Sequence, residues 1–310
     1  MSQYQHILVV IEPNRDHQPA LVHAKAMADR CGSKLTLFMT VYEASYEMTS
    51  LLSSQDRELL RQQLTAQRQQ QIDALADPLR QQGIEVDTKL CYHHHAFESI
   101  IQFAMKAPCQ LILKSTEEQE RKLRSVLFTP VDWSLMRKAP MPVLLVKQAT
   151  WPEGGIILVG VDVGTEDESH RELNQRLIWR ANNLAALTKA QVHLVNGYPS
   201  TPVNIAIELP DFDAQAYTNS LHEYHQLQMT QLAQQHNIPA EQCHVLEGLP
   251  EDVIPELAQR LKADLIVIGT IGRTGLSAAL LGNTAEHIIG AIDCDLLAEK
   301  PLGFVSPIQI

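Results

Sequence analysis

The same pattern begins twice along the chain. The apolar segment HILVVIEPN near the start ends in the acidic residue Glu12, and 150 residues later IILVGVDVG places Asp162 at the matching position. Each segment is followed by apolar residues at helical spacing and then by a second strand-like segment. A repeat of this length in a chain of 310 residues predicts two domains of one fold, one from each half.

Both halves go on to alternate strand-like and helix-like segments. The first and fourth predicted strands of each half are almost continuous runs of Val, Ile and Leu, which is typical of parallel strands covered on both faces. We therefore predict an α/β protein of two tandem, doubly wound domains, each with five parallel strands and four helices. After the two opening strands, the predicted strands are 33–43, 84–92, 110–116, 143–147, 190–199, 244–248, 264–270 and 295–300, and the clearest helices are 18–32, 56–83, 96–108, 171–188, 213–237 and 250–263.

The segment KQATWPEGG separates the halves, and its Pro-Glu-Gly-Gly ending is typical of a linker. We expect a first domain over residues 1–149 and a second over 155–310.

Composition narrows the possible partners. A formal net charge of -11 opposes a general electrostatic grip on nucleic acid, so we expect no direct nucleic-acid binding. No apolar stretch approaches the roughly 18 residues needed to cross a bilayer, and the N-terminus has no export signal. We therefore expect a cytoplasmic protein that does not bind membranes. The five cysteines form no Cys-x-x-Cys pair, which argues against structural zinc.

Doubly wound sheets bind ligands beyond the carboxyl ends of their strands, where the strand order reverses. In the second half these ends carry Asp162, Gly197, Gly248 and the segment GRTGLSAALLGNT that follows the fourth strand. Glycines let backbone N–H groups approach an anion closely, and a following helix N-terminus adds free donors. A phosphate cradle and a plain turn both fit this local pattern.

The repeat, the strand ILVGVD, the segment GLPEDVI and the segment DLIVIGTIGRTGLSAALLGNTAEHII together resemble the universal stress protein family over almost the whole chain. The resemblance implies a core similar to that of nucleotide alpha-hydrolases, with an acid near the adenine and ribose, the end of the second strand at the base, and a glycine loop at the phosphates. The family loop has nine residues between its second and third glycines, whereas six separate Gly275 from Gly282 here, and Asn283 stands where Ser or Thr is expected. The candidate ligand-binding residues are Asp162, Gly197, Gly248, Gly269, Thr270, Gly272, Arg273, Gly275, Gly282, Asn283 and Thr284.

The ligand implied by the resemblance is ATP or another nucleotide-containing molecule. The corresponding segment of the first half, KSTEEQERKLRSVLFTPVDWS, contains no glycine, so we expect that half not to cradle phosphates in this way. Family domains are generally dimeric, which implies that the two domains pair within the chain as a pseudo-dimer. The sequence leaves open whether two copies of the tandem chain form a homodimer.

Histidines offer a weaker candidate site. His93 and His95 alternate after the third strand of the first half and would point to one side of an extended chain, as two metal ligands do. The sequence supplies no third ligand, so we expect histidines at a surface or cleft without a metal. The pair His222 and His225 lacks the spacing of a helical zinc pair, and we interpret it as surface.

The sequence contains neither a Gly-x-x-x-x-Gly-Lys-Ser/Thr loop nor a Gly-x-Ser-x-Gly elbow. The favoured hypothesis is a non-catalytic stress-response protein whose second domain binds a nucleotide or nucleotide-linked metabolite and thereby regulates partner association and stress resistance. The alternative is a low-turnover enzyme that hydrolyses nucleotides or transfers nucleotidyl groups.

Overall fold

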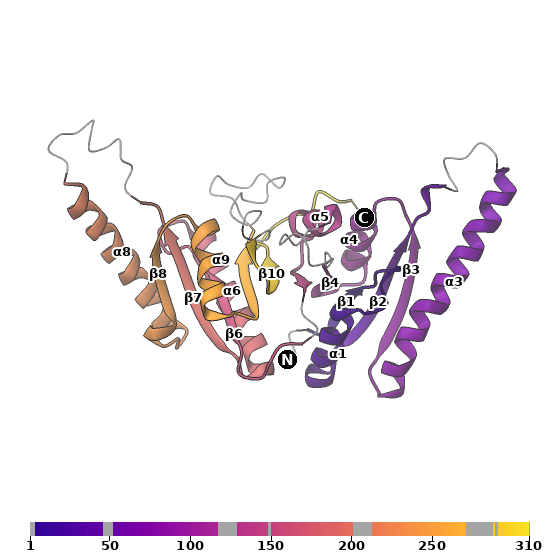
Figure 1. Cartoon of the computed structure of the whole chain (residues 1–310), viewed down its shortest axis with the longest axis horizontal. Coiled ribbons are helices and arrows are strands. Elements are labelled where there is room, and N and C mark those ends of the chain that lie inside the picture. The colour runs from indigo at the N-terminus through magenta and orange to yellow at the C-terminus, as the bar shows by residue number, and fades with distance from the viewer. Residues whose placement is uncertain are drawn as a thin grey trace. The chain divides into compact units, whose positions relative to one another are not determined.

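The computed structural model describes residues 4–45, 52–116, 129–147, 150–200, 213–270, 288 and 291–309 (Figure 1). These residues form two compact units. The first contains the described residues up to Thr150 together with 306–309, and the second contains those of 151–305. In the first unit Gln102 Nε2 donates a hydrogen bond to Gln309 O at 3.0 Å, which attaches the C-terminal residues to it.

The first unit alternates strands and helices in the predicted order. Its strands are β1 (His6–Val10), β2 (Lys34–Val41), β3 (Val86–Tyr92), β4 (Leu111–Ser115) and β5 (Val143–Val146), and its helices are α1 (Pro19–Cys31), α3 (Ser54–Gln81), α4 (Ala96–Lys106) and α5 (Pro130–Lys138).

Its strands pair in the order β3-β2-β1-β4-β5, and each pairing is parallel. The central strand β1 lies between β2 and β4, so that Ile7 pairs with Leu35 on one side and with Leu111 on the other. The chain runs outward from β1 through β2 to β3 and then returns to β4 on the other side. The strand order therefore reverses between β1 and β4.

The second unit repeats this plan. Its strands are β6 (Ile156–Gly160), β7 (Gln191–Tyr198), β8 (Cys243–Glu247), β9 (Leu265–Gly269) and β10 (Asp295–Glu299), and its described helices include α6 (Glu168–Thr188), α8 (Ala214–Gln235), the 3-10 turn η1 (Ala240–Gln242) and α9 (Pro250–Leu261). The parallel order is β10-β9-β6-β7-β8. Ile157 pairs with Val192 of β7 and with Leu265 of β9, so the reversal lies between β6 and β9.

Helices cover both faces of the second unit's strands. In β7, Asn196 contacts His225 of α8, whereas a Cβ on the next residue, Gly197, would meet Val253 of α9. Because successive residues of a strand point to opposite faces, α8 and α9 lie on opposite faces. The structure thus confirms the predicted tandem α/β fold with parallel, doubly wound strands. None of the described helices is long and apolar enough to span a bilayer.

Local sequence sets the helix starts. The Ser53 hydroxyl accepts a hydrogen bond from Asp56 N at 3.1 Å, and the Asp56 carboxylate accepts one from Ser53 N at 3.3 Å, which forms a capping box on α3. Helix α6 begins three residues before the predicted start at 171 because Asp167 caps it by accepting from Ser169 N.

Candidate functional site

The carboxyl ends of β6 and β7 bring the candidate ligand residues of the second unit together. Asp162 follows β6, and Asn196 and Gly197 lie near the end of the neighbouring β7. Gly248 follows β8, which pairs with β7 on its other side. This edge adjoins the point where the strand order reverses, as the sequence predicts.

The loop after β6 is braced by helix α6. Asn174 Oδ1 accepts from Asp162 N at 3.1 Å, and Asn174 Nδ2 donates to Asp162 O at 2.7 Å. The Asp162 carboxylate accepts from Gly164 N at 3.1 Å, which closes a tight turn. In this clasp Asn174 is 5% exposed, whereas Asp162 is half-buried and lines a cavity.

A second clasp joins the same loop to helix α8. Asn196 Oδ1 accepts from Val163 N at 3.2 Å, and Asn196 Nδ2 lies 2.9 Å from His225 Nδ1. Asn196 is 1% exposed and His225 is 6% exposed. A Cβ on Gly164 would collide with the His225 ring, so the missing side chain of Gly164 lets α8 approach the loop.

Aromatic and titratable groups surround His225. The Tyr198 ring stacks on its imidazole with the ring centroids 5.2 Å apart, and the Tyr198 hydroxyl lies 3.1 Å from His222 Nδ1. Burial lowers the pKa of His225, an effect that Asp162 opposes. Burial also raises the pKa of Tyr198, with a further contribution from Glu247. The predicted surface position is correct for the exposed His222 and wrong for His225, because His225 lies on the buried face of α8.

The candidate glycines of this edge have packing roles. Added Cβ atoms on Gly197 and Gly248 would lie 2.9 Å and 2.7 Å from Val253 side-chain atoms, and Gly248 has a φ of 138° that other residues rarely adopt. A Cβ on Gly269 would collide with the Leu173 side chain. The lack of a side chain at these three positions therefore lets α6 and α9 pack closely on the strands.

Thr270 directly follows β9 and is 5% exposed. Its N–H and its hydroxyl both donate to Glu299 O, at 3.0 Å and 3.1 Å. The first unit repeats this arrangement, since Thr116 donates to Val146 O in the same two ways. The remaining candidates lie outside the described residues, so their part in the site stays a prediction: Gly272, Arg273, Gly275, Gly282, Asn283 and Thr284.

A cavity of about 590 Å³ opens beside Asp162. Helix α6 lines it with Arg171 and Gln175, and helix α8 lines it with Tyr224 and Gln228. Amide, carboxylate, guanidinium and phenol groups thus surround the space, which suits a polar ligand rich in hydroxyl groups or charges.

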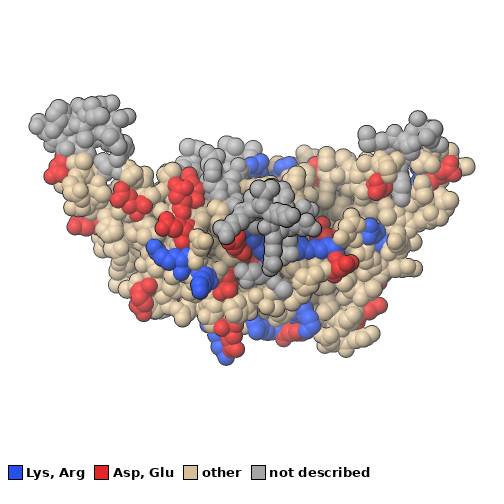
Figure 2. Space-filling model, in the orientation of Figure 1, with Lys and Arg blue, Asp and Glu red and all other residues tan. Residues whose placement is uncertain are grey.

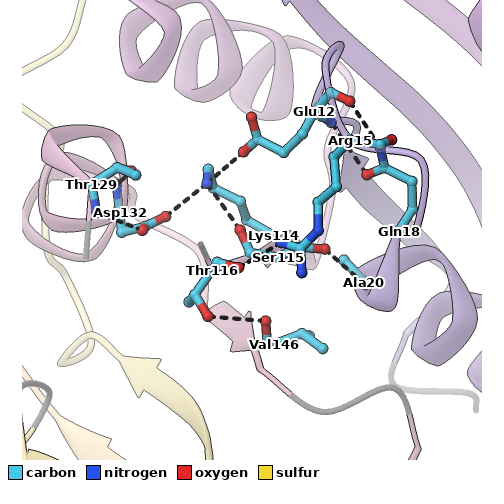
Figure 3. A network of polar contacts seen from close by, with 10 residues as sticks. All are labelled: Glu12, Arg15, Gln18, Ala20, Lys114, Ser115, Thr116, Thr129, Asp132 and Val146. Carbon is cyan, nitrogen blue, oxygen red and sulfur yellow. Dashed lines mark hydrogen bonds and ion pairs between the residues drawn. The ribbon is translucent and has the colours of Figure 1, made fainter. Parts of the chain in front are cut away.

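The corresponding edge of the first unit is occupied by its own side chains (Figure 3). Lys114, near the end of β4, places its ammonium nitrogen 2.6 Å from Glu12 Oε1 and 2.9 Å from Asp132 Oδ1. The ammonium group also donates to Ser115 O at 3.0 Å. Burial by itself lowers the pKa of Lys114, but the carboxylates of Asp132 and Glu12 outweigh it and raise that pKa.

The two units therefore differ in the surroundings of the acidic residue that follows the central strand. In the first unit Glu12 is neutralised by Lys114, whose side chain is 3% exposed. The strand pairings place Ile268 at the equivalent position of β9, so the second unit carries no ammonium group there.

The histidine run after β3 has local partners. His93 Nδ1 accepts from His95 N at 3.0 Å, and His95 Nδ1 lies 3.2 Å from Glu98 Oε1. Among the described residues, no group of three His, Cys, Asp or Glu side chains is placed to hold a metal ion.

On the face shown in Figure 2, basic and acidic side chains of the described residues are interspersed.

Comparison with known proteins gives the same two-part division. The model described as the universal stress protein family matches residues 3–147 and again residues 155–299. Universal stress protein E of Salmonella typhi is 45% identical to this chain over 311 residues, covering 100% of this chain and 98% of that protein. Universal stress protein E of Escherichia coli (strain K12) is 44% identical with the same coverage.

Solved structures show the same fold. A structure from Pseudomonas aeruginosa UCBPP-PA14 aligns with a TM-score of 0.75 and 32% identity, covering 97% of this chain and 95% of that one. A universal stress protein from Archaeoglobus fulgidus DSM 4304 aligns with a TM-score of 0.62 at 13% identity, covering 96% of this chain and 98% of that one. With both halves matched by the family model and relatives similar over the full length, the chain belongs to the universal stress protein family.

Proposed function

We propose that the second unit of this stress-response protein binds a nucleotide or a nucleotide-linked metabolite at the edge that carries Asp162. In this proposal, occupancy of the site regulates association with partners without turnover of the ligand. One contrast carries the proposal. The acid after the central strand is neutralised by Lys114 in the first unit, whereas in the second unit Asp162 borders a polar cavity of about 590 Å³.

The chemistry of the edge fits the sugar of a nucleotide. A carboxylate accepts hydrogen bonds from ribose hydroxyls. Asn174 holds the backbone of Asp162, and Asn196 holds that of Val163, which keeps the loop in place for such a contact. The glycine-bearing segment that begins at Gly272 follows β9, where it would meet the phosphates if it adopts the predicted cradle.

The hydrogen bonding of the buried histidine beside the Asp162 loop supports binding without turnover. His225 is the buried histidine nearest Asp162 in the hydrogen-bond network, and its Nδ1 faces Asn196 instead of the cavity. A general base must reach the proton that it abstracts, directly or through a water molecule. Since Nδ1 of His225 is engaged with Asn196, this histidine serves the structure of the loop.

Calorimetric titration of the full chain with ATP tests the proposal, with Asp162→Ala as the variant and Glu12→Gln as the matched change in the first unit. We expect wild type and Glu12→Gln to bind ATP. Loss of hydrogen bonds to a carboxylate should weaken binding by Asp162→Ala about tenfold to a hundredfold. Equal affinity in wild type and Asp162→Ala contradicts the assignment of this edge.

Two further measurements decide between binding and catalysis. Mass spectrometry of the small molecules released when gently purified protein is denatured identifies a retained ligand. Steady phosphate release from ATP by wild type that Asp162→Ala abolishes would establish the enzymatic alternative. A preparation that is empty and shows no thermal shift with ATP, GTP or UDP-sugars would remove the binding proposal.

A further inference from the structure

The amide of Asn196 has one orientation that satisfies its neighbours. The group 3.2 Å away on one side is the backbone N–H of Val163, which can only donate, so the amide oxygen must face it. The amide nitrogen therefore faces His225 Nδ1 at 2.9 Å. Because an amide nitrogen only donates, His225 must accept at Nδ1 and carry its proton at Nε2.

A protonated His225 conflicts with this arrangement. An imidazolium carries a proton on both ring nitrogens, so Nδ1 would point an N–H at the N–H groups of Asn196. Rotating the amide by half a turn would relieve that conflict but would turn its NH2 group toward the N–H of Val163. Asn196 is 1% exposed, so water does not readily replace the lost partner.

We propose that Asn196 and His225 are positioning residues for the loop that carries Asp162, and that protonation of His225 releases this loop from helix α8 and weakens ligand binding. The link to ligand binding rests on the proposed function. The link between His225 and the loop rests only on the contacts that Asn196 makes with Val163 and with His225.

The groups around His225 determine whether its pKa is raised or lowered. Asp162, on the loop after β6, is the acidic group that favours the protonated ring. His222, on α8 itself, disfavours it, and burial disfavours it more strongly. Tyr198, from β7, stacks on the ring, and Tyr224, on α8, meets it edge-on. The neutral form that the Asn196 contact requires is therefore the form present at neutral pH, and release occurs in the acidic range below the ordinary histidine pKa.

Nuclear magnetic resonance on full-length protein labelled at histidine and valine, with no nucleotide added, tests the link between His225 and the loop. Between about pH 7.5 and about pH 5, we expect the His225 ring to change from the Nε2–H tautomer to the imidazolium, and the Val163 amide signal to shift with the same midpoint. His17→Asn, which changes an exposed histidine of the first unit, should leave this midpoint in place. A Val163 signal that does not follow the His225 titration overturns the proposal, and so does a ring that stays neutral throughout.

Two variants separate positioning from general damage. His225→Asn offers Asn196 an acceptor that does not titrate, so the Val163 shift should disappear in folded protein, even though loss of the buried ring lowers the melting temperature. Asn196→Asp still accepts from Val163 N and now also accepts from a protonated His225. We expect that variant to raise the midpoint of His225, which a purely structural role for Asn196 does not predict.

Titration with ATP at several pH values tests whether protonation of His225 weakens ligand binding. Wild-type affinity should fall by up to about tenfold for each pH unit below the pKa of His225, and His225→Asn should lose most of this dependence. If ATP fails to bind at any pH while Val163 and His225 titrate together, the proposed function fails and the positioning of the loop stands. If ATP binds with the same pH dependence in wild type and His225→Asn, the link between protonation and binding is wrong.

Discussion

Lys114 and Asp132 form an ion pair of 2.9 Å in which the side chains are 3% and 0% exposed. The pair joins the end of β4 to the first turn of α5, and Lys114 also holds Glu12 after β1. The edge of the first unit is thus held by an internal cation, whereas Asp162 at the corresponding edge of the second unit borders a cavity. Breaking a buried ion pair lowers the free energy of unfolding far more than breaking an exposed one does. The role of this pair can therefore be tested by substitution.

Replacement of Lys114 by methionine should lower the free energy of unfolding by about 3–5 kcal/mol, because it leaves the Asp132 carboxylate buried and unpaired. Urea denaturation of the full chain measures the change. The control is Lys25→Met, which breaks the exposed pair of Lys25 and Asp29 and should cost less than about 1 kcal/mol. Equal losses in the two variants would refute the structural role of the Lys114 pair.

A pair of histidines, His193 buried and His244 half-buried, should make the second unit sensitive to acid. His193 Nδ1 lies 3.0 Å from His244 Nε2, and burial lowers the pKa of both rings below the ordinary 6.5. The unfolded chain then binds protons more tightly than the native chain. Stability that is fully present above about pH 6.5 is lost as the pH falls toward the native pKa values, at up to about 1.4 kcal/mol per pH unit for each proton.

His193→Leu should reduce this acid sensitivity, measured as the difference in the free energy of unfolding between about pH 7 and about pH 5. His17→Leu, at an exposed position of the first unit, serves as the control and should leave the difference unchanged. An undiminished acid sensitivity in His193→Leu would show that other groups cause it.

Cys109 should react more slowly with alkylating agents than Cys31 and Cys91. Burial raises the pKa of its thiol to about 12, whereas Cys31 and Cys91 are half-buried. The thiolate is the reactive form, so alkylation of Cys109 by iodoacetamide should be slower by about a thousandfold or more. Peptide mass spectrometry of the native protein measures the rates, and in urea the three rates should converge. Rapid alkylation of Cys109 in native protein would contradict its burial.

Gly269 should tolerate a methyl group only when its neighbour is made smaller. Gly269→Ala places a Cβ against Leu173, which should cost about 1–3 kcal/mol of unfolding free energy. Leu173→Ala by itself should cost about 2–5 kcal/mol because it leaves a cavity. The double variant should lose less than the sum, since each change relieves the other. Additive losses, measured by urea denaturation, would show that the two sites do not share this contact.

Much of the fold follows from local patterns. The runs of Val, Ile and Leu in the first and fourth strands of each half predict buried parallel strands, and the spacing of apolar residues predicts the helices between them. The start of α6 was missed because the capping residue Asp167 precedes the periodic segment by several residues. Caps and turns depend on single polar side chains, which leave a weaker trace in the sequence than a repeated apolar pattern.

The candidate site could be predicted only in part. The rule that ligands meet the carboxyl ends of strands predicts Asp162 and Gly197 as ligand residues, and the structure places both at that edge because the rule depends on topology alone. The spacing of His225, Met229 and Ala233 is the helical signal that marks the buried face of α8 and would have placed His225 inside. The spacing of Asn174, Ile178 and Ala181 marks the buried face of α6 in the same way, but no sequence pattern identifies Asp162 as the hydrogen-bond partner of Asn174.

The repeat, the alternation of strands and helices and the acid after each central strand can be read from the amino-acid order. That Lys114 neutralises Glu12, whereas Asp162 borders a cavity on a loop held by Asn174 and Asn196, depends on how the chain folds. The reason is physical: secondary structure depends on residues a few positions apart, whereas an ion pair or a buried amide clasp depends on groups that become neighbours only after the strands have paired.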